Sequence, residues 1–310
     1  MLNFFLEHKN SADHKKLTKK NNVYFIGGTI FLIGILFLYK FTFLSFIFLS
    51  IYLLGLFSDI NKLTSPKLRF IIQIFIVISA VIFYDVSITS TKIVFIDELL
   101  KFKLFQIFFS CFCLMVLING SNFIDGVNLN LVGYYIIVLI TIIFLSSNID
   151  LLINFNLIYS ILLILSLIYL LNSSGKFISG DSGAYTYGIF FGIFMIQFSN
   201  DNPLISPIFI ALLLWYPAFE NLFSIIRKKI IKLDPLDADN LHFHQLLFYF
   251  FKRKKNNYIK KFSNPISSLI INIYNFSIFF IGLSYFSHTK TLLFLILLNV
   301  TIYLFFYFLL

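Results

Sequence analysis

Long apolar runs separated by short polar segments constrain this chain more than any other feature of its sequence. Hydrophobic residues make up 59% of the 310 residues, and charged residues make up 12%. A helix of about 20 apolar residues is long enough to cross a bilayer. The sequence therefore predicts an all-α polytopic membrane protein, a bundle of about ten transmembrane helices that forms one domain over residues 1–310. The predicted spans are 23–39, 41–57, 68–84, 104–118, 129–145, 151–171, 185–198, 204–222, 265–286 and 291–309, and the shorter ones must extend into the adjoining segments.

Basic residues are distributed unevenly between the two sides of this predicted bundle. If the N-terminus lies in the cytoplasm, 19 of the 24 Lys and Arg residues fall on the cytoplasmic side and 5 on the other side. Cytoplasmic loops of membrane proteins are enriched in Lys and Arg. We therefore expect a multi-pass protein of the inner (plasma) membrane, with residues 1–22 and the loops after even-numbered spans in the cytoplasm. This placement explains the net charge of +10 by the membrane and not by nucleic acid.

Four polar clusters then fall on the cytoplasmic face, although they are far apart in the sequence. Polar and acidic groups next to hydrocarbon are costly unless they face water or protein, so they are read as functional by default. We expect the four clusters to form one site on that face. They are Asp59, the stretch NGSNFIDGVNLN from Asn119 to Asn130, Gly180 to Gly183, and His242 to His244.

The stretch NGSNFIDGVNLN combines one carboxylate with several amides between two apolar runs. Asn119, Asn122, Asp125 and Gly126 supply hydrogen-bond donors, acceptors and a flexible turn. The alternative is a short re-entrant loop that is held only by Asn and Gly turn chemistry.

Two further acids lie at the ends of apolar runs. Asp181 lies between glycines in SGDSGAYTYG, where an aspartate at a helix start is able to hold a hard cation that bridges to phosphate oxygens. Its alternative is a helix cap with small-residue packing behind it. Asp59, in GLFSDINKLTSPKLRF, also reads as a turn residue at the end of a helix.

The histidine cluster lies in DPLDADNLHFHQLLF, after the acids Asp234, Asp237 and Asp239. His242 and His244 are two residues apart, which suits an extended segment that points both rings at one ligand. We expect them to contact phosphate or to manage a proton. A zinc site and a solvated loop are the alternatives.

Together, acids for a hard cation, Gly-framed turns, basic residues and histidines favour phosphoryl transfer over transport. A metal ion and cationic side chains bind a pyrophosphate and offset the charge that builds on the leaving phosphate. The second substrate would then come from the lipid.

On these motifs the chain resembles the polyprenyl-phosphate N-acetylhexosamine-1-phosphate transferase family, the membrane enzymes that start O-antigen, teichoic acid and related cell-envelope glycans. NGSNFIDGVNLN is similar to the family's Asn-x-x-Asn-x-x-Asp-Gly motif, SGDSGAYTYG to its Gly-Asp-x-Gly motif, and NLHFHQLLF to its His-x-His motif. GLFSDINKLTSPKLRF is similar to its Asp-rich loop followed by Ser-x-Lys-x-Arg. The four motifs occur in family order, and the resemblance extends over nearly the whole chain.

The resemblance implies attack of undecaprenyl phosphate on the β-phosphate of a UDP-N-acetylhexosamine, with release of UMP. It also implies an active-site cleft on the cytoplasmic face, open to the inner leaflet, and the roles of individual residues. The expected catalytic residues are Asp59, Asp125, His242 and His244; the expected substrate-binding residues are Asn122, Gly126 and Asn128; and the expected ligand of Mg²⁺, or of Mn²⁺, is Asp181.

Several positions depart from the family pattern. Ser58 precedes Asp59 where many members have a second Asp, but a phosphate nucleophile is already largely ionised at pH 7 and needs no such base. Asn128 stands where a second Asp is frequent, and Gln245 replaces a frequent third histidine, which argues against the muramoyl-pentapeptide branch. Members also carry one more span before the basic loop, so the first family span is expected to be missing.

The alternative from another class is a non-catalytic homologue or a carrier of a lipid-linked intermediate. Such a protein would have no reason to keep Asp181, Asn122, Asp125 and both histidines on one face. The sequence leaves a homodimer open.

Overall fold

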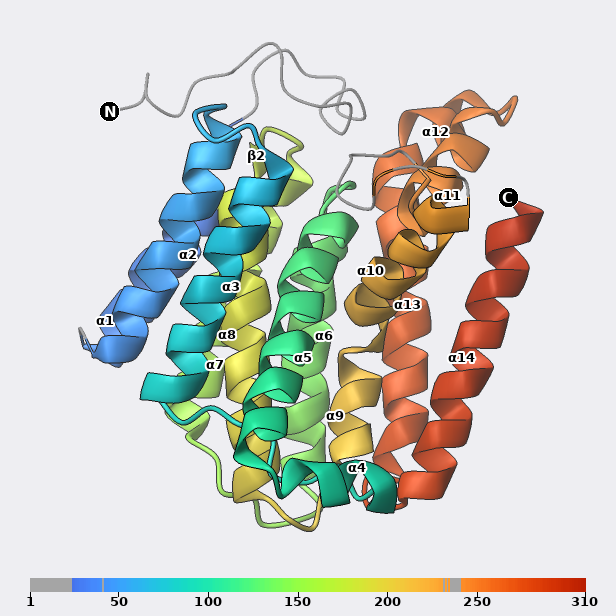
Figure 1. Ribbon diagram of the computed structural model, residues 1–310. Coiled ribbons are helices and arrows are strands. Elements are labelled where there is room, and N and C mark those ends of the chain that lie inside the picture. The colour runs from blue at the N-terminus through green and yellow to red at the C-terminus, as the bar shows by residue number, and fades with distance from the viewer. Residues whose placement is uncertain (1–23, 41, 231, 233, 235–240) are drawn as a thin grey trace.

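In a computed structural model, the chain forms a bundle of long helices that run side by side (Figure 1). The structure describes residues 24–40, 42–230, 232, 234 and 241–310. The predicted cytoplasmic segment 1–22 and the acids Asp237 and Asp239 lie outside these residues. The helices are α1 (Gly27–Tyr39), α2 (Phe43–Asp59), α3 (Pro66–Phe83), α4 (Val94–Leu100), α5 (Lys103–Ile124), α6 (Asn130–Ser146), α7 (Phe155–Ser173), α8 (Gly180–Asp201), α9 (Pro207–Leu213), α10 (Trp215–Ile230), α11 (Phe243–Lys252), α12 (Asn257–Lys261), α13 (Ser263–Leu283) and α14 (Thr289–Leu309).

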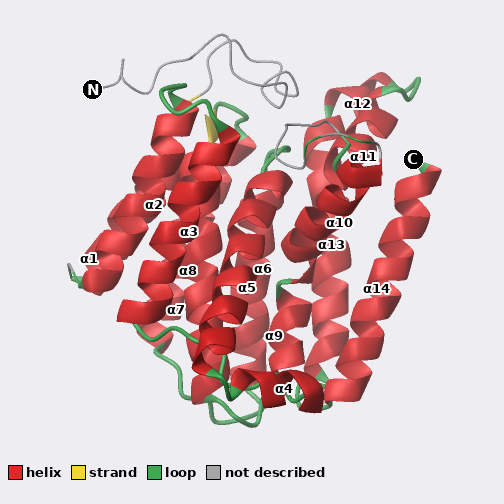
Figure 2. Cartoon of the chain, viewed as in Figure 1, coloured by secondary structure: helices red, strands yellow, loops and turns green. Residues whose placement is uncertain are grey.

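Two short strands are the β structure of the described residues (Figure 2). β1 (Tyr24–Phe25) pairs in parallel with β2 (Phe177–Ile178), with Tyr24 opposite Phe177. The pair ties the chain before α1 to the segment that leads into α8.

Within the described residues, five helices are long and apolar enough to cross a membrane, namely α3, α5, α7, α13 and α14. The pair α9 and α10 passes the same test as one bent span, and α1, α2 and α6 are shorter apolar helices. The all-α membrane class is therefore as predicted. A helix overlaps each of the ten predicted spans, but the number that cross the bilayer stays a prediction.

Large apolar side chains cover the outer surface of the bundle. Phe37 is 83% exposed, Leu104 84% and Phe308 77%. Exposed apolar surface of this extent would aggregate in water and is the surface that lipid covers in a membrane protein.

Polar residues at chain positions just before the helices explain where several of them begin. Ser65 and Ser206 each accept a hydrogen bond from a backbone amide in the first helical turn, and each is followed by proline, which suits the first helical position. Asn154 caps α7 in the same way through the amide of Leu157. These caps fix the ends of α3, α7 and α9.

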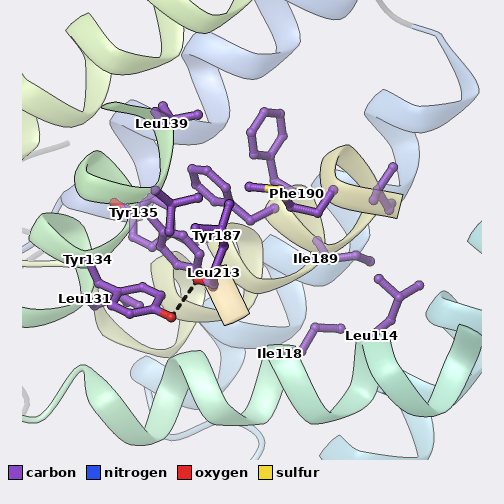
Figure 3. Packing of buried hydrophobic residues seen from close by; sticks show 14 of the residues in the cluster. Leu114, Ile118, Leu131, Tyr134, Tyr135, Leu139, Tyr187, Ile189, Phe190 and Leu213 are labelled. Atoms are coloured by element: carbon purple, nitrogen blue, oxygen red, sulfur yellow. Dashed lines mark hydrogen bonds between the residues drawn. The ribbon is translucent and has the colours of Figure 1, made fainter. Parts of the chain in front are cut away.

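The buried core is one large cluster of apolar and aromatic side chains, part of which is shown in Figure 3. The chain bends by 73° between α9 and α10, inside this core. A bend frees backbone carbonyls that have no water to bind in a membrane interior. Tyr134 on α6 donates a hydrogen bond of 2.7 Å to the carbonyl of Leu213, at the break (Figure 3). The bend is thereby stabilised, and α10 is directed towards α11.

The polar clusters lie at the same end of the bundle, the end at which β2, α11 and α12 are found and opposite to α4 (Figure 1). The sequence predicted this arrangement from the distribution of Lys and Arg. That this end faces the cytoplasm stays a prediction.

Candidate active site

Asp59 caps the N-terminus of α8. Its Oδ1 accepts a hydrogen bond of 2.9 Å from the amide of Asp181, and its Oδ2 accepts one of 3.0 Å from the amide of Ser182. The side chain is only 7% exposed. A carboxylate is favoured at this position because the first amides of a helix have no partner within the helix and carry the positive end of its dipole. Asp59 therefore orients the turn that carries Asp181, and its direct part in catalysis stays a prediction.

Gly180 makes this close approach possible. Its φ is +68°, and a Cβ at this position would lie 2.7 and 2.9 Å from the two carboxylate oxygens of Asp59. Further along, Gly183 packs against Gly28 of α1, and Gly188 packs against the backbone of Ile118 on α5. The glycines after Asp181 thus serve helix packing, which is the alternative that the sequence left open for them.

Asp181 meets a cation and a hydroxyl group at the start of α8. Its Oδ2 accepts a hydrogen bond of 2.5 Å from Ser58 Oγ and one of 2.8 Å from Arg69 Nη1. Arg69 also donates to Ser58 Oγ. The side chains of Arg69 and Asp181 are 21% and 23% exposed. Ser58, the residue that departs from the family pattern, therefore takes part in the contacts of the predicted metal ligand.

Asp125 completes a group of three acids. It follows directly after α5 and is half-buried. Loss of surrounding water and the nearby carboxylates of Asp59 and Asp181 raise the pKa of Asp125 well above its usual range. Three separate segments of the chain therefore bring their carboxyl groups together at the start of α8.

The oxygen donors at the start of α8 can be compared with the ligands that the predicted Mg²⁺ requires. Mg²⁺ is usually held by one or two carboxylates, while water and substrate phosphates supply its other ligands. Asp125 and Asp181 supply such oxygens. Within the residues that the structure describes, no group of three or more His, Cys, Asp or Glu side chains is arranged to hold a metal ion. Two carboxylates are the kind of donor set that shares Mg²⁺ with a phosphate, so Mg²⁺ at Asp125 and Asp181 stays a prediction, and the zinc alternative at the histidines stays open.

The stretch from Asn119 to Ile124 is helical, because α5 continues to Ile124. The alternative of a short re-entrant loop therefore does not hold for this half, and the extension expected of the short predicted span 104–118 is confirmed. Asn119 donates to Gln73 Oε1 over 3.1 Å and to the carbonyl of Met115 over 2.9 Å, which is a packing role. Asn122 lies half-buried on the last turn, three residues before Asp125.

Asn128 lies in the loop after α5, where α13 holds its backbone. Its amide donates to Asn264 Oδ1 over 2.8 Å, and its carbonyl accepts from Ser268 Oγ. The next residue, Leu129, has a positive φ of 70°, and its carbonyl accepts from Asn272. These contacts fix the shape of the loop that contains Gly126 and Asn128.

Gly126 brings the acidic group and the histidines together. A Cβ at Gly126 would overlap the ring of His244, so the loop and the ring touch as closely as glycine allows. The rings of His242 and His244 lie parallel, with centroids 5.8 Å apart and an interplanar angle of 3°. That both rings point at one ligand stays a prediction, and His244 lies inside α11 and not in an extended segment or loop. Gln245 accepts a hydrogen bond from the amide of His242 over 3.2 Å.

Glu220 on α10 is a candidate that sequence reasoning missed. It is fully buried, and its Oε1 lies 2.9 Å from His242 Nδ1. The signal was present, because Glu220 is a lone acid in the apolar run WYPAFENLFSII, and an ionisable residue in such a run indicates function. Its partner could not be read from the sequence.

The structure thus brings each predicted site residue to one end of the bundle. Asp59, Asp125 and Asp181 meet at the start of α8, and the contact between Gly126 and His244 joins them to the histidines. The cleft between them stays a prediction.

Comparison with protein-family models gives one match over residues 41–199, to the model described as glycosyl transferase family 4. This range is just over half of the 310 residues, and it is shorter than the nearly whole-chain resemblance carried by the motifs. It contains the three acids and ends before Glu220 and the histidines. The comparison with curated proteins finds no match.

Proposed function

The chain belongs to glycosyl transferase family 4, whose members transfer a sugar phosphate to a polyprenyl phosphate, and on that premise we propose its reaction. It transfers an N-acetylhexosamine 1-phosphate from a UDP-sugar to undecaprenyl phosphate and releases UMP. The apolar helices described above make it a multi-pass membrane protein, which suits an acceptor that is dissolved in lipid. We place the reaction on the cytoplasmic face of the plasma (inner) membrane, since the basic residues gather at that end.

In this reaction an oxygen of the lipid phosphate forms a bond to the β-phosphorus of the UDP-sugar. The bond between that phosphorus and the oxygen that bridges it to the α-phosphate breaks, and the bridging oxygen leaves with UMP. The product is a sugar joined to the lipid through a diphosphate. A phosphate monoester has a second pKa of about 6, so the nucleophile is largely ionised at pH 7 and needs no base. This supports a reaction in which Asp59 serves as a helix cap and Ser58 replaces a second Asp.

The observation that carries the proposal is the group of acids at the start of α8 with Arg69 beside it. Asp181 and Asp125 are suited to hold Mg²⁺, or Mn²⁺, together with phosphate oxygens of the donor. When bound, the ion offsets the charge that develops on the transferring and leaving phosphates. Arg69, 2.8 Å from Asp181, is placed to reach the same phosphates. His242 and His244 then bind the diphosphate from the other side of Gly126, and Asn122 contributes to the nucleotide site.

The test measures UMP release by the purified protein in lipid, with a panel of UDP-sugars, with and without undecaprenyl phosphate. We expect release from a UDP-N-acetylhexosamine only when both undecaprenyl phosphate and Mg²⁺ or Mn²⁺ are present. Asp181→Asn keeps the size of the side chain and removes its charge, so it should lower turnover by ~10²-fold or more, the scale for losing a preorganised electrostatic contact.

The matched control is Asp201→Asn, which makes the same change at an exposed residue at the other end of α8. It should keep wild-type turnover. If Asp181→Asn stays active at equal expression, or if EDTA fails to stop the reaction, the metal-dependent mechanism is wrong. A wild-type protein that is silent with every donor would favour a non-catalytic homologue or a carrier.

A further inference from the structure

Glu220 is the centre of a buried polar network that joins three helical segments. Its Oε1 lies 2.9 Å from Nδ1 of His242, directly before α11, and its Oε2 accepts a hydrogen bond of 2.7 Å from the hydroxyl of Tyr303 on α14. The amide of Phe243 also donates to Oε1, over 3.4 Å. Glu220 is 0% exposed, Tyr303 4% and His242 5%.

Burial of this carboxylate is costly, which makes its position informative. Removing an ionised carboxylate from water costs several kcal/mol unless charge and hydrogen bonds compensate. Here both oxygens are used, and their partners come from two separate segments, the start of α11 and α14. The neighbours Phe219 and Phe223 pack on Tyr303 with ring centroids 5.0 and 5.7 Å apart, so an apolar side chain would suit packing here. Packing alone therefore does not account for an acid at position 220.

The network defines the orientation of the His242 ring. When Nδ1 carries a proton, it donates to Glu220, and the carboxylate selects this arrangement because it accepts hydrogen bonds only. The other ring nitrogen, Nε2, then contacts a phosphate of the UDP-sugar. Phe123, 4.8 Å from the ring of His242, and the parallel ring of His244 restrict rotation further.

We propose that Glu220 is a positioning residue, which fixes the ring orientation and the Nδ1–H form of His242 for recognition of the diphosphate, and that Tyr303 holds Glu220 in place. This inference rests on the proposed function, because it assigns the phosphate contact to His242. Glu220 itself touches no substrate. It acts through the histidine, as an outer carboxylate does when it orients a histidine that binds a ligand.

The first test is a double-mutant cycle on the full-length protein in lipid. Glu220→Leu should lower kcat/KM for the UDP-sugar by ~10²-fold, the scale for a misplaced contact group. Glu220→Leu combined with His242→Ala should be no slower than His242→Ala alone, since residues that act as one unit are not additive. If the fold decreases in kcat/KM of the two single variants multiply in the double variant, Glu220 acts independently of His242. This result would overturn the proposal.

Two further variants keep the test valid if Glu220→Leu unfolds. Glu220→Gln retains an acceptor for Nδ1 and should restore most of the activity. Tyr303→Phe keeps the hydrogen bond between Glu220 and His242 but removes the hydroxyl that holds Oε2. Its decrease in kcat/KM should therefore be smaller than that of Glu220→Leu. In the His242→Ala background, Tyr303→Phe should cause no further decrease. The matched control is Asn275→Leu. Asn275 Oδ1 accepts a buried hydrogen bond of 2.9 Å from Trp215 Nε1, which lies on α10 as Glu220 does. Its replacement should leave kcat/KM unchanged below the unfolding temperature.

A spectroscopic measurement separates this inference from the proposed function, because it requires no UDP-sugar. Nitrogen NMR of protein labelled with ¹⁵N-histidine, with the His242 signals assigned from the His242→Ala spectrum, reports which ring nitrogen carries the proton. We expect a protonated Nδ1 in the wild type and a mixture of tautomers in Glu220→Leu. That result in a protein without transferase activity would uphold the positioning role and contradict the proposed reaction. If the wild-type enzyme is active but the His242 signals are unchanged in Glu220→Leu, the proposed reaction is upheld and the positioning role of Glu220 is contradicted.

Discussion

The amide of Asp181 donates a hydrogen bond of 2.9 Å to the carboxylate of Asp59, so the last residue of α2 holds the residue that is expected to bind the metal. The two acids therefore have different tasks although both lie in predicted motifs. Asp59 faces the helix N-terminus with both oxygens, whereas Asp181 directs its carboxylate towards Ser58 and Arg69. Changes at the two positions should consequently have different effects.

Replacement of Asp59 should lower stability. Asp59→Ala leaves the amides of Asp181 and Ser182 without their acceptor, and loss of a helix cap costs ~0.5–2 kcal/mol of the free energy of unfolding. Asp59→Asn keeps one acceptor oxygen and should lose less. Thermal unfolding in detergent measures the difference. Ser206→Ala, which removes the cap of α9, should destabilise to a similar degree without loss of activity. Unchanged stability of Asp59→Ala would refute the capping role.

Ser58 and Arg69 should differ in their importance for turnover. Ser58→Ala removes one neutral donor from Asp181, whose ion pair with Arg69 remains, so we expect a loss of no more than about tenfold. Arg69→Met removes the only positive charge that is paired with Asp181 among the described residues and should cost more. The turnover of Arg69→Lys should lie between those of Ser58→Ala and Arg69→Met. UMP release at saturating Mg²⁺ checks this order, and an Ser58→Ala variant slower than Arg69→Met would contradict it.

The contact between Gly126 and His244 should not tolerate a methyl group. Gly126→Ala would push the ring of His244 and the loop after α5 apart, and a displacement of about 1 Å in a site can cost ~10²-fold in rate. Gly34→Ala is the matched control, because its added methyl group meets only the flexible end of the Ile164 side chain, in the interface of α1 and α7. Equal activities of the two variants would show that this contact does not matter for function.

The loop before α4 should lose stability in acid through Asp97. Partial burial acts in the opposite direction, but hydrogen bonds from Thr91, Ser90 and the amide of Lys92 lower the pKa of Asp97 below its ordinary value of 3.8. A lowered folded-state pKa means that the carboxylate contributes stability above the ordinary value and that this contribution disappears as the pH falls through the folded-state pKa.

Asp97→Asn should therefore be less stable than the wild type at pH 7, and the difference in Tm should shrink as the pH falls below about 4. Glu98→Gln changes the neighbouring acid, whose partner is the exposed Lys101, and should show no such dependence. A constant difference between wild type and Asp97→Asn across this pH range would contradict the assignment.

The sequence predicted much of this architecture, because its strongest signals are local. The helices follow from apolar runs, and the gathering of Asp59, Asp125, Asp181 and the histidines at one end follows from the distribution of Lys and Arg. α5 extends to Ile124, as expected of a predicted span that is too short to cross a membrane, but the point at which it ends could not be read from the sequence, since Asn and Gly favour turns and here pack against neighbouring helices. Tertiary contacts overrode the local preference.

The role of Glu220 and the helix break at Leu214 depend on partners that are distant in sequence. Tyr303 follows Glu220 by 83 residues, and Tyr134 precedes Leu213 by 79. No local pattern marks either pair. A lone acid in an apolar run was nevertheless a signal that could have been used.

In the proposed reaction a sugar phosphate, and not a sugar alone, is transferred to the lipid. UDP-N-acetylhexosamine labelled with ³²P at the β-phosphate distinguishes the two when it is incubated with the protein, undecaprenyl phosphate and Mg²⁺. We expect the label in the lipid fraction, in the diphosphate that joins the sugar to the lipid, and unlabelled UMP as the released nucleotide. Label that remains with the nucleotide as UDP, while the sugar reaches the lipid, would rule out this reaction.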